Sequence, residues 1–226
     1  MATQDTWTIE GYRGRQVPNR FFQVGDGERE NDQLAVILPG IRYTNDAPVL
    51  YYARKLLLEQ QQSDVLAVDY GYGFDRRFQE APADAREQWM RTDMEALIAA
   101  INGRQQYTRL TLVTKSLGTI IATRMLAAGI THNTRLVWLT PVLSDTGVAG
   151  ALRQAVSPSM VVIGTEDRYY DAGILSDLGQ TDSVKVLEME GADHRLEVQG
   201  DALRSLDILG RYVRELDGFL RGEFAS

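Results

Sequence analysis

The chain contains no cysteine among its 226 residues. It therefore has no disulfide, no thiolate metal site and no cysteine nucleophile. A chain without cysteine fits the reducing environment of the cytoplasm. Histidine is nearly as scarce, with only two residues in the whole chain. Any chemistry that needs an imidazole base must therefore use one of these two side chains.

Long apolar runs and clustered positive charges are also missing. No segment approaches the ~18–20 consecutive apolar residues of a membrane span, and residues 1–5 resemble neither the basic nor the apolar part of a secretory signal. We therefore expect a cytoplasmic protein without a membrane partner. The 24 basic residues are scattered and outnumbered by 31 acidic ones, for a net charge of −7. Because nucleic-acid binding needs clustered Lys and Arg, we expect no nucleic-acid partner.

Short apolar runs alternate with longer segments of helical periodicity, in a chain that is 44% hydrophobic and 24% charged. Runs rich in Val, Ile and Leu that end at Gly, Pro, Asp or Thr are typical of strands buried in a parallel sheet. The predicted strands are Leu34–Leu38, Val65–Val68, Leu110–Val113, Leu136–Leu139, Met160–Ile163 and Val184–Leu187. The predicted helices are Pro48–Gln62, Ala83–Ile101, Thr119–Ala128 and Asp201–Leu220.

Two further strands are predicted near the N-terminus, Thr6–Ile9 and Arg20–Val24, as an antiparallel pair joined by a turn that contains Gly and Pro. The strand–helix alternation after them is typical of a mostly parallel sheet with helices on both faces. We therefore expect an α/β fold with a central sheet of about eight strands. Neither a linker nor a repeat interrupts the pattern, so residues 1–226 are expected to form one domain.

Ser116 lies between a predicted strand and a predicted helix, in Thr114-Lys-Ser-Leu-Gly118. This context matches the G-x-S-x-G turn, in which a serine nucleophile is exposed between a strand and a helix. The turn is sharp, so small residues are needed two positions before and two after the serine. Gly118 meets this need, whereas Thr114 replaces the usual glycine and is expected to hold the helix slightly further from the strand. The alternative is that Ser116 is only a helix N-cap.

An acid and a histidine follow later strands, where partners of a serine nucleophile are expected. Asp167 comes soon after the strand Met160–Ile163, and His194 follows the next strand. The chain order of serine, acid and histidine is a known order of catalytic triads. The second histidine, His132, precedes a strand and is therefore expected at the opposite edge of the sheet.

Other assignments remain open for the acid and the base. Asp145 follows the preceding strand, and Glu166 and Asp171 lie close to Asp167 in the chain, so each is an alternative acid. The alternative for His194 is a surface histidine that bonds to its neighbour Asp193.

Gly40 follows the strand Leu34–Leu38, where a turn can aim a backbone amide at the nucleophile. An oxyanion hole in this context takes one amide from this loop and one from the residue after the serine, which predicts Ile41 and Leu117. Pro39 stands where histidine is usual. The same residues would also suit a plain turn between a strand and a helix.

Together these four segments resemble the α/β-hydrolase superfamily, and the Lys-Ser-Leu-Gly turn is similar to that of small bacterial members without a cap domain. The resemblance extends from about Leu34 to the C-terminal helix. It implies a serine hydrolase that cleaves a carboxylic ester or thioester of a small substrate through an acyl-enzyme. Ser116 would be the nucleophile, His194 the base and Asp167 the residue that orients it. It implies no metal and no cofactor.

The segment Leu143–Pro158 has room for only one short helix, so we expect no cap domain over the site. A shallow, open site would be lined by Arg42, Tyr43, Tyr70 and Tyr72, which follow strands at the same edge of the sheet. The alternative is that these aromatic residues only pack at the rim.

Two other functions fit parts of the sequence. The first is a catalytically silent α/β-hydrolase fold that acts as a binding module. The second is a nucleotide-binding loop, suggested by Thr114-Lys-Ser116, but no G-x-x-x-x-G precedes this Lys-Ser pair.

Overall fold

A computed structural model of the protein describes residues 2–25, 31–60, 63–104, 107–130 and 133–223. The strands are β1 (Thr3–Asp5), β2 (Asn19–Gln23), β3 (Gln33–Leu38), β4 (Asp64–Val68), β5 (Arg109–Lys115), β6 (Thr134–Leu139), β7 (Ser159–Gly164) and β8 (Val184–Met189). The helices are α1 (Pro48–Gln60), α2 (Arg76–Glu80), α3 (Ala83–Asn102), α4 (Leu117–Ala127), α5 (Thr146–Arg153), α6 (Ala172–Leu178) and α7 (Ala202–Arg221). A short 3₁₀ helix spans Tyr12–Gly14.

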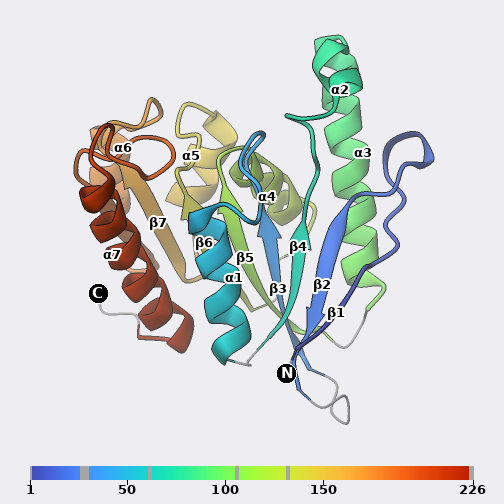
Figure 1. Cartoon of the computed structure of the whole chain (residues 1–226), viewed down its shortest axis with the longest axis horizontal. Coiled ribbons are helices and arrows are strands. Elements are labelled where there is room, and N and C mark those ends of the chain that lie inside the picture. The colour runs from blue at the N-terminus through green and yellow to red at the C-terminus, as the bar shows by residue number, and fades with distance from the viewer. Residues whose placement is uncertain (1, 26–30, 61–62, 105–106, 131–132, 224–226) are drawn as a thin grey trace.

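The eight strands form one sheet in the order β1-β2-β4-β3-β5-β6-β7-β8 (Figure 1). β1 pairs antiparallel with β2, and β2 pairs antiparallel with β4. All other neighbours are parallel. The expected mostly parallel α/β architecture is therefore confirmed.

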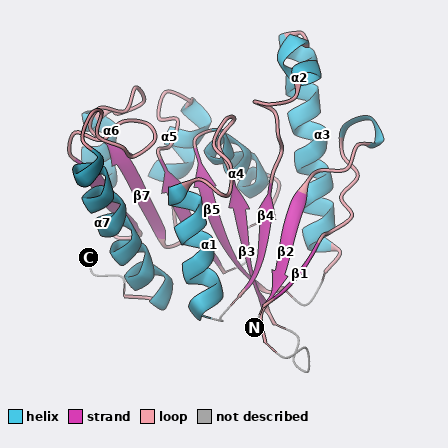
Figure 2. Cartoon of the chain, viewed as in Figure 1, coloured by secondary structure: helices cyan, strands magenta, loops and turns pink. Residues whose placement is uncertain are grey.

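Side chains of the central strands alternate between two apolar cores, because successive residues point to opposite faces of a sheet. On β3, Leu34 and Val36 face a core formed with α3, α4, α5 and α6. Ala35 and Ile37 face a second core formed with α1 and α7. The magenta sheet accordingly lies between two layers of cyan helices in Figure 2.

The N-terminal strand differs from its predicted position. β1 covers Thr3–Asp5 instead of Thr6–Ile9. The backbone of Trp7 is bonded to the buried side chain of Asn19, which accepts from its N–H at 2.9 Å and donates to its carbonyl at 2.8 Å. A side chain thus replaces the strand partner that the backbone of Trp7 would need.

The remaining predicted elements are present, with ends shifted by at most two residues. The predicted helix end Gln62 lies outside the described residues. Two short helices were not predicted, α2 and α6. Each begins at an aspartate whose carboxylate accepts from the helix backbone, Asp75 in α2 and Asp171 in α6. Among the described residues between β6 and β7, α5 is the one helix, which agrees with a fold that lacks a cap. No helix in the described ranges is long and apolar enough to cross a membrane.

Candidate active site

The candidate site lies at the carboxyl ends of β3 and β5. β4 lies on one side of β3 and β5 lies on the other. The direction in which strands are added to the sheet therefore reverses between β3 and β5. Ligands of open α/β sheets bind at such a switch point. Gly40 follows β3 and Ser116 follows β5, and a Cβ placed on Gly40 would lie 3.3 Å from the Cβ of Ser116. The topology therefore brings the two predicted loops together.

The backbone at Ser116 has the sharp conformation of a nucleophile turn. Its φ of 51° and ψ of −115° lie in a region that costs a non-glycine residue energy. The turn holds α4 close to β3, since a Cβ added to Gly118 would lie 2.1 Å from the carbonyl oxygen of Leu38. Thr114 fits because its hydroxyl donates to the carbonyl of Val137 in β6 at 3.0 Å.

The side chains of Ser116, His194 and Asp167 form a continuous chain of hydrogen bonds. Ser116 Oγ lies 2.9 Å from His194 Nε2, and His194 Nδ1 lies 2.8 Å from the nearer carboxylate oxygen of Asp167. An ionised carboxylate only accepts, so Nδ1 carries the proton and donates it to Asp167. Nε2 is then free to accept the hydroxyl proton of Ser116. These are the contacts that a serine nucleophile and its base require.

Asp167 is fixed as well as buried. Its side chain has no exposed surface, and one of its oxygens accepts from the amide of Tyr169 at 2.9 Å. The other acids that the sequence left open are placed differently. Asp145 and Asp171 accept from backbone amides at the starts of α5 and α6, and Glu166 is exposed.

Asp193 shapes the loop that carries His194. Its carboxylate accepts from the amides of Arg195 at 2.7 Å and Glu197 at 3.1 Å. It therefore holds the backbone of the loop and makes no bond to the imidazole, unlike the alternative left open for His194. The other histidine, His132, lies outside the described residues.

Lys115 is a buried lysine directly before Ser116. Its side chain is 1% exposed, and its ammonium donates to Thr140 Oγ1 and to the backbone carbonyl of His194, each at 2.7 Å. It also lies 4.6 Å from the centre of the Tyr43 ring. Burial lowers the pKa of Lys115 to about 7, although the carboxylates of Asp167 and Asp193 act in the opposite direction.

The two amides predicted for an oxyanion hole flank Ser116. Leu117 is the first residue of α4, where backbone amides have no partner inside the helix. Among the described residues, the amide of Ile41 donates to no acceptor. The loop that follows β4 supports this segment, since a Cβ on Gly73 would lie 2.0 Å from the carbonyl oxygen of Ile41.

A cavity of about 230 Å³ opens above Ser116 and His194. Of the residues predicted to line the site, Arg42 and Tyr43 line this cavity. Tyr70 lines an adjoining depression beside Ile41. Tyr72 lies elsewhere, in the core, where its hydroxyl donates to Asp93 at 2.9 Å and its ring stacks on that of Tyr70. Its place in the chain predicted the correct edge of the sheet but not the direction of the side chain.

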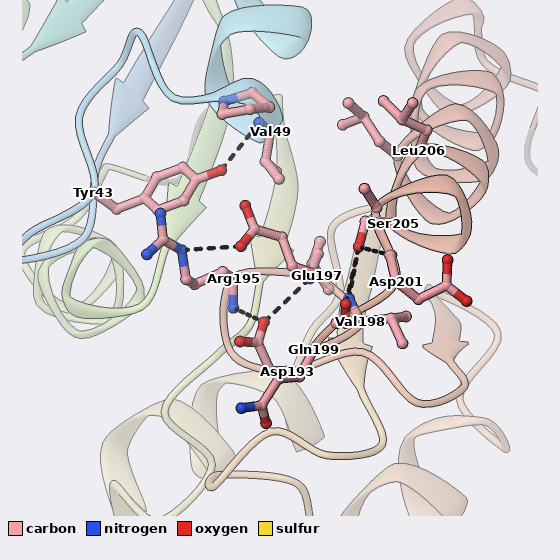
Figure 3. A pocket seen from close by; sticks show the side chains of 15 residues that line it. Tyr43, Val49, Asp193, Arg195, Glu197, Val198, Gln199, Asp201, Ser205 and Leu206 are labelled. Atoms are coloured by element: carbon pink, nitrogen blue, oxygen red, sulfur yellow. Dashed lines mark hydrogen bonds and ion pairs between the residues drawn. The ribbon is translucent and has the colours of Figure 1, made fainter.

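A larger groove of about 880 Å³ lies beside the cavity, between α1, α7 and the loop 193–201 (Figure 3). Tyr43 and Arg195 line both spaces. In Figure 3 the Arg195 side chain lies under the ring of Tyr43 and pairs with Glu197.

Three cavity residues were not identified from the sequence, Lys115, Arg168 and Arg195. Each is a direct neighbour in the chain of a predicted triad residue. That adjacency was the available signal, but it does not tell whether a side chain points into the cavity or away from it.

No family model and no curated protein sequence matches the chain. Solved structures do match. Est1E from Butyrivibrio proteoclasticus, with ferulic acid bound, is 15% identical with a TM-score of 0.69, over 95% of this chain and 98% of that one. The esterase Pf2001 from Pyrococcus furiosus is 13% identical with a TM-score of 0.69, over 99% and 94%. Dienelactone hydrolase from Anabaena variabilis is 13% identical with a TM-score of 0.65, over 98% of each chain.

These matches cover 95–99% of the chain. Identities of 13–15% bear on the fold alone. The chain therefore has the α/β-hydrolase fold.

Proposed function

We propose that the protein is a serine hydrolase that cleaves a carboxylic ester or thioester of a small molecule. The observation that carries this proposal is the continuous hydrogen-bonded series from Ser116 Oγ through the His194 ring to the buried carboxylate of Asp167. Solved structures with the same fold include an esterase and a dienelactone hydrolase, which supports the same class of reaction.

The proposed reaction begins with attack of Ser116 Oγ on the carbonyl carbon of the substrate. His194 Nε2 takes the hydroxyl proton, and Asp167 stabilises the imidazolium that forms. The carbonyl electron pair moves to oxygen, where the amides of Ile41 and Leu117 would stabilise the negative charge. When the tetrahedral intermediate collapses, the bond to the alcohol or thiol breaks and His194 returns the proton to that leaving group.

Water completes the cycle. His194 takes a proton from a water molecule, the resulting hydroxide attacks the acyl-enzyme carbonyl, and Ser116 leaves with the proton returned by His194. The acid product is released and the side chains regain their initial protonation states. Every proton is carried by His194, so this mechanism needs no cofactor.

A fluorophosphonate probe tests the nucleophile directly, because it phosphonylates an activated serine. The wild type is expected to gain mass on the tryptic peptide that contains Ser116, and Ser116→Ala is expected to gain none. Ser144→Ala is the matched control, since Ser144 is an exposed serine that follows the adjacent strand β6. A folded wild-type protein that stays unlabelled would contradict the proposal and would favour a binding role for the fold.

A panel of p-nitrophenyl esters and matched thioesters then tests the reaction itself. The wild type is expected to hydrolyse at least one of them, and Ser116→Ala none above the background rate. We further propose that this activity resides in the cytoplasm, because the chain lacks cysteine. Recovery of the enzyme in a periplasmic or secreted fraction would contradict that placement.

A further inference from the structure

The cavity above Ser116 is lined by basic groups and by no carboxylate. Its ionisable lining residues are Arg42, Arg168, Arg195 and the triad histidine, with Lys115 and Tyr43 at its inner wall. The whole chain, in contrast, carries 31 acidic and 24 basic residues. A locally positive cavity in an acidic protein concentrates anions where the bulk of the surface repels them.

Each of the three arginines follows a residue of the proposed catalytic machinery in the chain. Arg42 follows Ile41, Arg168 follows Asp167 and Arg195 follows His194. The three loops after β3, β7 and β8 converge on Ser116, so their arginines converge as well.

The arginines have few partners of their own. Among the described residues, neither Arg42 nor Arg168 forms an ion pair, and both are exposed. The guanidinium of Arg168 lies 4.8 Å from the centre of the Tyr169 ring, and that ring meets the His194 ring edge-on at 5.3 Å. This stacking places a positive charge beside the base without neutralising it.

Arg195 differs because a carboxylate holds it. Glu197 lies 3.4 Å from its Nε, and the ring of Tyr43 lies above it in Figure 3. The remaining guanidinium nitrogens can still donate, since an arginine carries five N–H donors. The pairing with Glu197 thus orients Arg195 and leaves donors for a ligand.

We propose that the substrate is an anionic ester, with a carboxylate or phosphate group that these arginines bind while Ser116 attacks the acyl carbon. Guanidinium groups bind both oxyanions through paired hydrogen bonds. The anion would lie on the acyl or the alcohol side of the scissile bond. This inference rests on the proposed serine hydrolase function.

Two matched pairs of substrates test the effect of a negative charge on the alcohol side and on the acyl side of the scissile bond. On the alcohol side, 4-acetoxybenzoate is compared with its neutral analogue 4-acetoxybenzamide, and 4-acetoxyphenyl phosphate adds the phosphate. On the acyl side, the mono-p-nitrophenyl ester of adipic acid is compared with p-nitrophenyl hexanoate. For at least one pair, kcat/KM of the wild type is expected to be on the order of tenfold higher for the anion. This ratio is expected to fall as salt is added, because salt screens exposed charges.

Arginine variants show which residues produce the preference for anionic esters. Arg42→Gln, Arg168→Gln and Arg195→Gln are each expected to lower the anion-to-neutral ratio of kcat/KM several-fold, and the triple variant is expected to abolish it. Arg109→Gln is the control, since Arg109 is an exposed arginine at the opposite end of β5. Thermal melting of every variant shows that it is folded.

The outcomes separate this proposal from the proposed function. Hydrolysis of the neutral esters with no preference for an anion would overturn the proposal and leave the hydrolase function standing. A preference that persists in the triple variant, or that Arg109→Gln also removes, would overturn it as well. Hydrolysis of neither member of any pair would overturn both.

Discussion

The ammonium of Lys115 donates a hydrogen bond to the backbone carbonyl of His194 at 2.7 Å. Lys115 therefore holds the main chain of His194, although the two residues are 79 positions apart in the sequence. Lys115 is buried, and among the described residues its ammonium has no carboxylate in direct contact. It joins the loop after β5 to the loop after β8.

The first prediction concerns stability against pH. The pKa of Lys115 is lowered to about 7 in the folded protein, against about 10.4 in an unfolded chain. Between these values the unfolded state binds more protons, so the free energy of unfolding is expected to rise with pH. Below pH 7 the protonated Lys115 destabilises the folded state to its full extent. Urea titrations at pH 7, 8 and 9 measure this rise, which is at most about tenfold in the folding equilibrium per pH unit.

Lys115→Met is the matched variant, because it keeps an apolar stem without the charge. Its stability is expected to depend less on pH over the same interval. The interval ends at pH 9 because burial also raises the pKa of Tyr43, to about 12. At higher pH this tyrosine ionises first in the unfolded chain, which lowers the free energy of unfolding. Equal pH dependence in the wild type and in Lys115→Met would show that other groups control stability here.

The second prediction assigns the triad acid. Asp167→Asn leaves the shape of the site but removes the charge that orients His194, so kcat is expected to fall by about 10³–10⁴. Asp145→Asn is expected to retain wild-type kcat, because asparagine caps α5 as well as aspartate does. Steady-state kinetics on the best ester of the panel compare the two. A larger loss in Asp145→Asn would transfer the role to that residue.

The third prediction concerns the turn at the nucleophile. In Gly118→Ala the new Cβ would meet the carbonyl oxygen of Leu38 at 2.1 Å, so α4 must move away from β3. We expect a loss of about 2–3 kcal/mol in stability and a displaced Ser116. Gly150→Ala in α5 is the control, since no atom lies within 4 Å of its added Cβ. Alanine favours helices, so this control should gain about 0.5–1 kcal/mol. Calorimetry that finds both variants equally stable would contradict the packing argument.

The fourth prediction concerns acyl chain length. The loop after β4 does not form a lid, because Tyr70 and Tyr72 are buried and Phe74 at its end is 66% exposed. Carbons beyond the cavity at Ser116 would remain hydrated, so we expect kcat/KM for neutral p-nitrophenyl esters to be flat or falling beyond about four to six acyl carbons. Full burial would instead add about fourfold per CH₂. A steady rise to the decanoyl ester would place the chain in the groove beside Tyr43 and Leu209.

The fold could be predicted because strand periodicity and helix periodicity alternate clearly along this chain. Prediction failed where a side chain replaced a backbone partner. The segment around Trp7 has the alternation of a strand, yet Asn19 takes its hydrogen bonds. Helices α2 and α6 were missed because they are short and depend on an aspartate cap more than on an apolar face.

The candidate triad could be proposed from chain order and from the ends of strands, since topology fixes which loops meet. The direction of a side chain at those ends depends on packing that the pattern does not contain. Tyr72 and Arg168 both follow strands at this edge of the sheet, but their side chains point in different directions. The first turns into the core toward Asp93, and the second turns toward the cavity.

The loops that carry Asp167 and His194 are joined to each other by two hydrogen bonds. The amide of Glu166 donates to the carbonyl of Ala192 at 3.0 Å, and the amide of Gly191 donates to Thr165 Oγ1 at 2.8 Å. We therefore expect Asp167 and His194 to unfold together with β7 and β8 as one cooperative unit. Heating should then abolish turnover and melt the sheet at the same temperature, whereas independent loops would fray first and inactivate the enzyme while it was still folded.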